Sequence, residues 1–349
     1  MTKKIMSIVA VLLLVTALFS GCTKEQVLKA FSIDIDTYDP ATEMVTDVMN
    51  KTIQSENLQS GDYKYNLFTD DTAAITGYTG NNAVLNIPET LDGHTVVALE
   101  NKALYKLEVI TELVLPDTVE VVGNFAAMYC ENLEKVTFGK NIKNIGVSAF
   151  ESEGDETKSL GGGKLTTIVF NGSPEMIREK AFYYADKLTE IVLPENVKTI
   201  ENWAFAKCFK ADKIVIGEGN EIIGDHAFLK CRAAKSITIP DSCKTISTSA
   251  FYQCLSATDL SIGNGVEEMQ KGAFEECSSL EKVVLPESLK TMAPYIFYNC
   301  TSLKECVAGD KIEFIDKDVF TGDKEVVVNA PSGSVMAEYA EANKVSLAK

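Results

Sequence analysis

The stretch AFLKC at residues 227–231 recurs almost unchanged as AFAKC at 204–208, AFYQC at 250–254 and AFEEC at 273–277. The phenylalanine position of this motif can be followed along most of the chain, and eight of its nine intervals are 23 residues long. The remaining interval is 32 residues long and therefore carries nine extra residues. The equivalent positions are Leu104, Ala127, Phe150, Phe182, Phe205, Phe228, Phe251, Phe274, Phe297 and Phe320. A fixed period in this range predicts a solenoid of stacked coils.

Each period has the same internal order. Segments such as LTEIVLP at 188–194 and LEKVVLP at 280–286 alternate apolar and polar residues, which predicts a short strand in every coil. A proline or glycine ends most strands, as suits a backbone corner, and Asn171 is the exception. The corner residues are Pro116, Gly139, Pro194, Gly217, Pro240, Gly263, Pro286 and Gly309. One coil cannot bury its own apolar residues, so stacking must place leucine, isoleucine and phenylalanine in columns of a shared core.

A second, longer period begins at Pro194. The segments PENVKTI, PDSCKTI and PESLKTM recur at a spacing of 46 residues, and the coils between them begin with glycine instead of proline. The array therefore looks built by duplication of a two-coil unit.

The combined pattern, L-x-x-I-x-[IL]-P-x-x-V-x-x-I-x-x-x-A-F-x-x-C-x-x-L, resembles the BspA-type (Treponema pallidum-type) leucine-rich repeats of bacterial surface proteins over residues 85–349. The resemblance implies a β-rich solenoid. Its 23-residue coils would form one parallel sheet, with short helical or 3-10 turns on the other side and a C-terminal helical cap. The segment 85–99 is similar to a first coil with a five-residue bulge, LDGHT. The end resembles the family's cap, with a helix over Val335–Asn343 that begins at Ser334.

The chain is expected to divide into five parts. Residues 1–21 would form an export signal, 22–62 a tether, 63–103 an N-terminal cap with the first coil, 104–322 the repeats, and 323–349 the C-terminal cap. The tether is predicted because this segment is polar and lacks a clear period. Caps are expected because the open ends of a stacked core must be shielded.

The first residues have the composition of an export signal. Lys3 and Lys4 precede an apolar run, Ile5–Phe19, whose 15 residues are fewer than the ~20 that a membrane-spanning helix needs. The following LFSGC resembles a bacterial lipoprotein lipobox, with phenylalanine where leucine is usual. The resemblance implies a diacylglyceryl thioether on Cys22 and an exported protein that is lipid-anchored at the bacterial cell surface. An ordinary secretory signal is the alternative.

Composition and motifs argue against nucleic acid binding and against catalysis. The net charge is −17, whereas phosphate binding needs a basic face. His94 and His226 are far apart in the array, so no catalytic triad is indicated, and His226 is expected at the surface. The segment DIDTYD at 34–39 lacks the central glycine and terminal glutamate of a calcium loop. We therefore expect no enzymatic activity, no cofactor and no bound metal.

Nine cysteines are present, and six of them follow the phenylalanine position by three residues. These are Cys130, Cys208, Cys231, Cys254, Cys277 and Cys300. A straight column does not provide tetrahedral metal geometry and the chain lacks a C-x-x-C pair, so the pattern favours small buried thiols. Disulfides between adjacent coils are the alternative, because an exported protein meets oxidants, although bridge geometry is demanding.

The outward-facing residues of the predicted strands form the default binding surface. They are Glu190, Val192, Lys213, Val215, Ser236, Thr238, Asp259, Ser261, Lys282 and Val284. The valines among them either contribute to binding or reflect strand propensity alone. Tyr183, Trp203, Tyr252 and Tyr298 either form a stripe that stacks on sugars or cover the outer flank. The insertion at 151–164 is acidic and then glycine-rich, and it is expected to project as a loop.

Together these features predict a non-catalytic, lipid-anchored surface protein that binds other macromolecules through its repeat surface. A large rigid surface lowers the ordering cost of binding. The family resemblance implies adhesion or host-factor binding, with a protein or glycan as ligand and membrane contact through the lipid anchor. The alternative is a glycan-binding accessory module of a surface complex.

Overall fold

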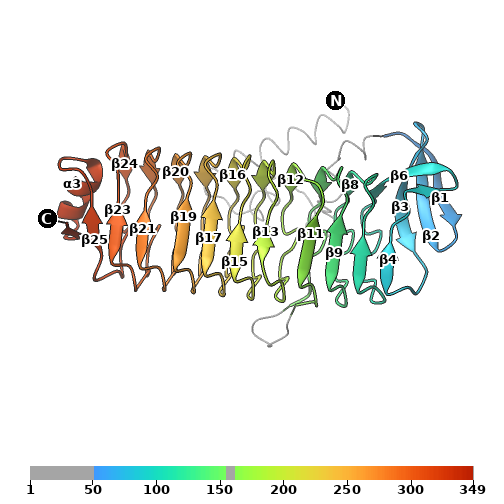
Figure 1. Ribbon diagram of the computed structural model, residues 1–349, viewed down its shortest axis with the longest axis horizontal. Coiled ribbons are helices and arrows are strands. Elements are labelled where there is room, and N and C mark those ends of the chain that lie inside the picture. Colours follow the sequence, from blue (N-terminus) through green and yellow to red (C-terminus); the bar gives the residue numbers. More distant parts are fainter. Residues whose placement is uncertain (1–50, 155–161, 349) are drawn as a thin grey trace, which may run out of the picture. The chain divides into compact units, whose positions relative to one another are not determined.

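The computed structural model describes residues 51–154 and 162–348. The predicted signal, Cys22, the segment 34–39 and most of the predicted tether lie outside these residues. The described part of the chain is a β-solenoid of about 12 turns (Figure 1). It has no helix that combines the length and the apolar character required to cross a membrane.

One wall of the solenoid, here called the long-strand wall, consists of parallel strands that are divided into three ladders of four (Figure 1). The first ladder contains β4 (Val84–Asn86), β7 (Glu112–Val114), β9 (Lys135–Phe138) and β11 (Thr167–Phe170). The second contains β13 (Ile191–Val192), β15 (Lys213–Val215), β17 (Ser236–Ile239) and β19 (Asp259–Ile262). The third contains β21 (Lys282–Val284), β23 (Glu305–Val307), β25 (Val327–Asn329) and β26 (Ser346–Leu347). Residues 23 positions apart pair across the second ladder, as Ile191 does with Ile214.

A second wall, here called the short-strand wall, is one continuous ladder of mostly two-residue strands. After β6 (His94–Leu99) come β8 (Val121–Val122), β10 (Asn144–Ile145), β12 (Met176–Ile177), β14 (Thr199–Ile200), β16 (Ile222–Ile223), β18 (Thr245–Ile246), β20 (Glu268–Met269), β22 (Thr291–Met292) and β24 (Phe314–Ile315). The predicted parallel solenoid is confirmed, but this second ladder was not predicted. Two residues are too few to show an alternating pattern in the sequence.

The Ala-Phe motif forms turns that bond to the next coil. Ala204 N donates to Glu201 O at 3.3 Å, which closes a β-turn. The next amide, Phe205 N, donates instead to Ala227 O of the following coil at 2.8 Å. Trp203 has a φ of 62°, and this left-handed conformation prevents the turn from continuing as a 3-10 helix. The motif therefore supplies hydrogen bonds both within a coil and between coils.

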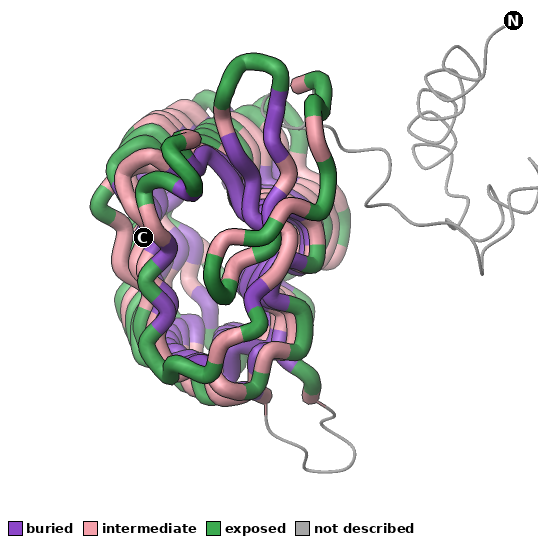
Figure 2. Tube along the Cα trace, turned by 90° about the vertical axis from the view of Figure 1, so that its right-hand side faces the viewer, coloured by how far each residue is buried: buried purple, intermediate pink, exposed green. Residues whose placement is uncertain are grey.

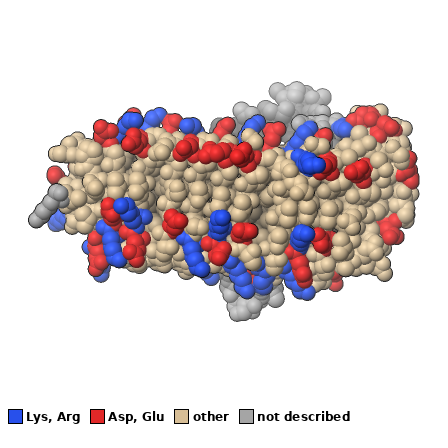
Figure 3. Space-filling view, in the orientation of Figure 1, with Lys and Arg blue, Asp and Glu red and all other residues tan. Residues whose placement is uncertain are grey.

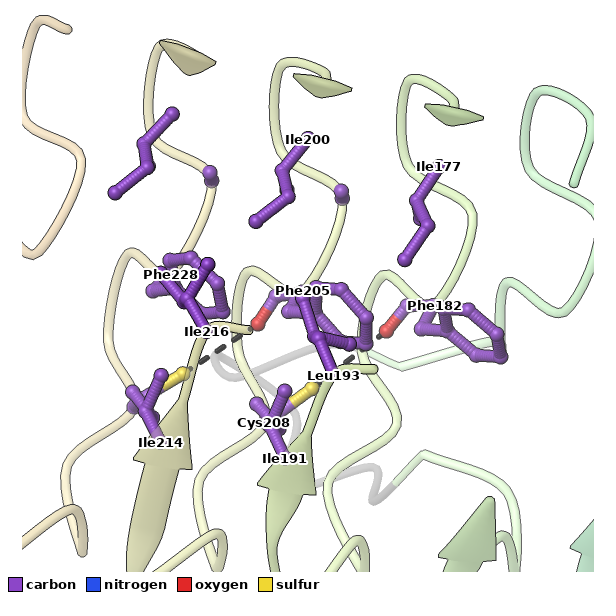
Figure 4. Packing of buried hydrophobic residues seen from close by; sticks show 14 of the residues in the cluster. Ile177, Phe182, Ile191, Leu193, Ile200, Phe205, Cys208, Ile214, Ile216 and Phe228 are labelled. Atoms are coloured by element: carbon purple, nitrogen blue, oxygen red, sulfur yellow. Dashed lines mark hydrogen bonds between the residues drawn. The ribbon is translucent and has the colours of Figure 1, made fainter. Parts of the chain in front are cut away.

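The phenylalanine rings pack as one column (Figure 4). Rings of consecutive coils from Phe150 to Phe320 have centroids 5.1–5.9 Å apart and interplanar angles of 11° or less. The nine extra residues before Phe182 do not interrupt the column, since its ring lies 5.3 Å from that of Phe150. Seen end-on, the buried residues line the inside of the coils (Figure 2). The predicted core column is confirmed.

An antiparallel meander precedes the first coil. Strands β1 (Ile53–Ser60), β2 (Tyr63–Phe68) and β3 (Thr72–Tyr78) pair in this order, and β3 pairs in parallel with β6. Strand β1 lies in the segment predicted to be a tether, so the predicted boundary at residue 62 was wrong. The sequence of β1, IQSENLQS, is polar, and its strand depends on pairing with β2.

The LDGHT segment that was predicted to bulge is a short β-hairpin. Strand β5 (Thr90–Leu91) pairs with β6 in an antiparallel register, and Leu91 lies opposite His94. The two residues between them, Asp92 and Gly93, both have positive φ, as the favoured two-residue hairpin turn requires.

The predicted C-terminal cap helix is confirmed. Helix α3 runs over Val335–Ala342, and the Ser334 Oγ at its N-cap accepts a hydrogen bond from Ala337 N at 3.3 Å. Its buried residues include Met336 and Ala340, which join the core. The helix therefore shields the C-terminal end of the stacked core.

The alternation of proline and glycine at the corners has a steric cause. A Cβ on Gly217 would lie 2.3 Å from the carbonyl oxygen of Pro194 in the preceding coil. On Gly139 and Gly263 it would lie 2.2 Å from the equivalent proline carbonyl. Such contacts require glycine, because it lets two backbones approach closely. Gly309 differs, since a Cβ there would meet nothing within 4 Å.

Candidate binding surface

The ten predicted binding residues lie together on the outside of the long-strand wall. They form a charged row of Glu190, Lys213, Ser236, Asp259 and Lys282, and a valine row of Val192, Val215, Thr238, Ser261 and Val284. All ten are at least partly accessible to solvent. The residues that alternate with them along each strand, such as Ile191 and Ile214, are buried in the core. The predicted alternation is therefore present, and a role in binding stays a prediction.

The charged row contributes little net field to this wall, because its charges alternate in sign. Two pairs bridge neighbouring coils: Lys135 Nζ lies 2.7 Å from Glu112 Oε1, and Lys282 Nζ lies 3.0 Å from Glu305 Oε2. Exposed pairs of this kind stabilise a protein only weakly. The apolar part of the wall is therefore the stronger candidate for contact with a ligand.

The long-strand wall has two seams where neighbouring strands are not paired. They lie between β11 and β13 and between β19 and β21. At the first seam Ile168 and Phe170 are half-buried, whereas the equivalent Val136 and Phe138 are fully buried. A cleft of about 70 Å³ lies there between the two strands, and Phe205 is among its lining residues.

An exposed valine lies beside each seam. Val192 is the first residue of the valine row after the first seam, and its exposed fraction is 45%. Val284 is the first after the second seam, and its exposed fraction is 53%. Beside the second seam, Leu260 and Ile262 are half-buried. Four strand spacings separate Val192 from Val284, or about 20 Å. The wall thus carries two apolar sites at a fixed separation.

The sequence did not predict the seams. The 151–164 insertion precedes β11 and is a signal for the first seam, because it changes the length of one coil. The 23-residue period runs unbroken through β19 and β21, so no sequence signal marks the second.

Two of the four aromatic residues predicted to stack on sugars lie together on the outer flank. The rings of Tyr183 and Trp203 are 6.3 Å apart, and Trp203 stacks on His226 at 4.2 Å with an angle of 8°. Tyr252 and Tyr298 lie on other coils and contact other side chains. His226, predicted at the surface, is half-buried because Trp203 covers one face of its ring, and this burial lowers its pKa.

The eight cysteines of the described residues are free and buried. In the column, each thiol donates to a carbonyl 26 residues earlier, as Cys208 Sγ does to Phe182 O at 3.6 Å (Figure 4). Burial raises the pKa of Cys130 to about 12 and raises the pKa of Cys254 well above its usual value. The predicted column of small buried thiols is confirmed. Within residues 51–154 and 162–348, no group of three potential ligands is arranged to hold a metal ion.

The repeat positions identify the family. Residues 97–222 and 204–327 match the family model described as BspA type Leucine rich repeat region. The chain belongs to the BspA-type leucine-rich repeat family. The matched BspA-type residues contain the whole column from Leu104 to Phe320.

Solved structures of other leucine-rich repeat proteins are similar to this BspA-type chain. A leucine rich cell surface protein of Faecalibacterium prausnitzii A2-165 is 21% identical over 83% of this chain and 97% of its own, with a TM-score of 0.38. The T. pallidum leucine-rich repeat protein is 20% identical over 83% and 96%, with a TM-score of 0.29. The pneumococcal vaccine antigen PcpA is 17% identical over 84% and 98%, with a TM-score of 0.38. No curated protein matches the chain significantly.

Membership of the BspA-type family indicates a non-catalytic binding role. It also indicates a location on the cell surface or outside the cell. The long-strand wall is compatible with such a role, because it presents accessible side chains on a sheet backed by a packed core.

Proposed function

We propose that this BspA-type protein is lipid-anchored at the bacterial cell surface and binds a protein ligand through the long-strand wall, as in adhesion or host-factor binding. The observation that carries this proposal is the exposure of Val192 and Val284 beside the two seams. Exposed apolar patches are typical of protein interaction sites, and a few apolar anchors supply most of the binding energy. A rigid sheet holds both anchors in place before the ligand arrives.

The test compares two walls of one protein. Purified protein is used to capture ligands from host extracellular matrix, and the captured proteins are identified and then titrated singly. The variant Val192→Ser/Val284→Ser is expected to lower affinity at least tenfold with an unchanged melting temperature. Ile222→Ser is the matched control, because Ile222 is 43% exposed on the short-strand wall. Equal binding by both variants would refute a role for the long-strand wall.

The lipid anchor has its own test. Cys22→Ala removes the thiol that lipidation requires, so the variant is expected to lose incorporation of labelled fatty acid and to leave the membrane fraction. Cys243→Ala is the control, because Cys243 lies in the folded core. Membrane association and labelling of the Cys22→Ala protein equal to those of the unaltered protein would rule out this anchor.

The second candidate function is glycan binding at the outer flank. It is favoured by the contact of Tyr183 with the Trp203–His226 stack. Aromatic rings and sugars pack through their apolar faces. A glycan array would detect this activity, and Trp203→Leu is expected to abolish it while leaving capture by the long-strand wall intact.

A further inference from the structure

One edge of the array carries a concentration of positive charge in a chain whose net charge is −17. Here it is called the basic edge, and it consists of residues 186–187, 207–213 and 230–235, which lead into β13, β15 and β17. Its basic residues are Lys187, Lys207, Lys210, Lys213, Lys230, Arg232 and Lys235, and its only acids are Asp186 and Asp212. These segments have a net charge of +5, which the exposed Glu190, beside Lys213 on the adjacent coil, reduces to +4. Lysine and arginine side chains gather at the lower edge of the view in Figure 3.

The charges of the basic edge are arranged differently from those elsewhere in the array. On several other coils, lysines pair with acids of the adjacent coil, as Lys198 does with Glu175 and Lys304 does with Glu281. At the basic edge Lys210, Lys213 and Lys235 are exposed, and no ion pair joins them to a carboxylate of the described residues. Like charges on consecutive coils raise the local positive potential, and this attracts anions.

Aromatic rings lie next to these charges. The Lys207 ammonium lies 5.1 Å from the ring centroids of both Tyr183 and Tyr184. The Arg232 guanidinium lies 4.8 Å from the ring of Phe209, which packs edge-on against Tyr184. Tyr184 is buried, so Tyr183 and Phe209, which are both half-buried, are the rings that remain accessible beside these cations.

We propose that the basic edge binds an acidic polysaccharide, in which carboxylate or sulfate groups repeat along a linear chain of sugars. The anionic groups would meet the lysines, and the sugar faces would contact the neighbouring rings. Coils about 4.8 Å apart present cations at a spacing comparable with successive sugar units. This inference gives the glycan-binding candidate a ligand class and does not rest on the protein-binding role of the long-strand wall.

The surroundings of the basic edge favour a thin polymer over a broad anionic surface. The coil that leads into β11 carries Glu153, the coil before it carries Glu131 and Glu134, and the coil that follows the basic edge carries Asp259. A membrane would bring anionic headgroups against these acids as well, and over short distances repulsion between like charges is only partly screened. A polysaccharide that lies along the three coils of the basic edge avoids the acidic residues of the flanking coils. The site therefore accommodates a segment of only a few sugars.

The experiment measures binding of the full-length protein to heparin fragments and to polygalacturonate by titration calorimetry. Dextran serves as the neutral polysaccharide, and single-stranded DNA and phosphatidylglycerol vesicles serve as the other polyanions. Lys210→Ala/Lys235→Ala is the test variant, because neither residue belongs to the charged row. Lys290→Ala/Lys304→Ala is the control, since it removes equal charge from exposed positions on other coils.

At least one acidic polysaccharide is expected to bind, with an affinity that falls as salt is raised and drops about tenfold in the test variant but not in the control. Tyr183→Leu is expected to weaken binding to the polysaccharide without changing its salt dependence. Dextran binding equal to that of the acidic chains would support the glycan-binding function yet overturn this inference. Tighter binding to DNA or vesicles, equal losses in both lysine variants, or no binding to either acidic polysaccharide would also overturn it.

Discussion

Asp323 occupies, in the last coil, the position that cysteines hold in the five preceding coils. Its side chain is buried, and neither carboxyl oxygen has a hydrogen-bond partner among the described residues. Burial raises the pKa of Asp323 to about 8, because a charged carboxylate loses its hydration in the core. At neutral pH the carboxyl is therefore mostly protonated, and the column continues through it as a neutral group.

The raised pKa of Asp323 predicts a pH-dependent stability. The unfolded chain releases this proton near pH 3.8, so between about pH 4 and pH 8 the folded protein binds one proton more. Its free energy of unfolding therefore falls as the pH rises through this window and levels off above it. Asp323→Asn is expected to remove this contribution and to raise the melting temperature most at pH 8. Thermal melts from pH 4 to pH 9 test this.

Asp310→Asn is the control, because Asp310 is exposed in the same coil. If the two variants show the same difference from the unaltered protein at every pH, the raised pKa of Asp323 is refuted.

The phenylalanine column predicts a large effect for a single truncation. Phe251 is fully buried between the rings of Phe228 and Phe274, both 5.2 Å away. Phe251→Ala is expected to cost about 3–5 kcal/mol, because it leaves a cavity with a wall on each side. Urea denaturation measures the loss. Val284→Ala, at an exposed position, should cost less than about 0.5 kcal/mol, and equal costs for the two variants would argue against the stacked core.

At the scale of the element, the contact between successive corners sets the two-coil period. At the Pro116, Pro194 and Pro240 corners the carbonyl lies where the next corner would place a Cβ, so that next corner is glycine; Gly309, which follows Pro286, is not under this constraint. The sequence alone showed the alternation without its cause, because the close approach involves residues 23 positions apart.

Two glycines of this corner column predict opposite outcomes. Gly217→Ala would place a Cβ 2.3 Å from Pro194 O, so it is expected to destabilise the protein by about 1–3 kcal/mol as the coils shift apart. The added Cβ of Gly309→Ala meets no atom within 4 Å, so this variant is expected to be neutral or to stabilise the protein by up to about 1 kcal/mol. The gain would come from the lower conformational entropy of the unfolded chain. Thermal melts of both variants provide the comparison. Equal destabilisation would show that the close approach does not matter.

The strands, the ring column and the cap helix could be predicted because each depends on a pattern within a single coil. LTEIVLP shows its buried and exposed faces by alternation, and Ser334 marks the start of α3. The short-strand wall and the seams could not be predicted, because they depend on pairing between coils, and strand β1 could not, because its polar sequence forms a strand only by pairing with β2. For the candidate site, the outward direction of Val192 was predicted, but its position beside an unpaired seam was not.

At the scale of the whole molecule, the coils contact mainly their immediate neighbours. Residue pairs 23 positions apart join each strand only to the strands of the adjacent coils. Stability in such an array is approximately a sum over coils and their interfaces, so end coils open more often than central ones.

The buried thiols predict a gradient of reactivity along the array. In the native protein Cys300 and Cys306, near the C-terminal end, are expected to react with an alkylating reagent faster than Cys254 in the middle. Labelling resolved by mass spectrometry measures the rates. In denaturant without reductant, all three should be labelled rapidly, since they are free thiols. Identical native rates at the three sites would show that the array opens only as one unit.

The column of unpaired thiols has a consequence for the route by which a surface protein matures. Once the coils have stacked, each thiol is buried away from oxidants, and burial raises the pKa of Cys254 well above its usual value, so that it stays protonated. During secretion the same thiols are accessible, and a disulfide bond between two of them would link coils that are not neighbours in the folded solenoid. Successful maturation therefore requires the solenoid to fold before its thiols are oxidised. The folding rate is then as important for this protein as its final stability.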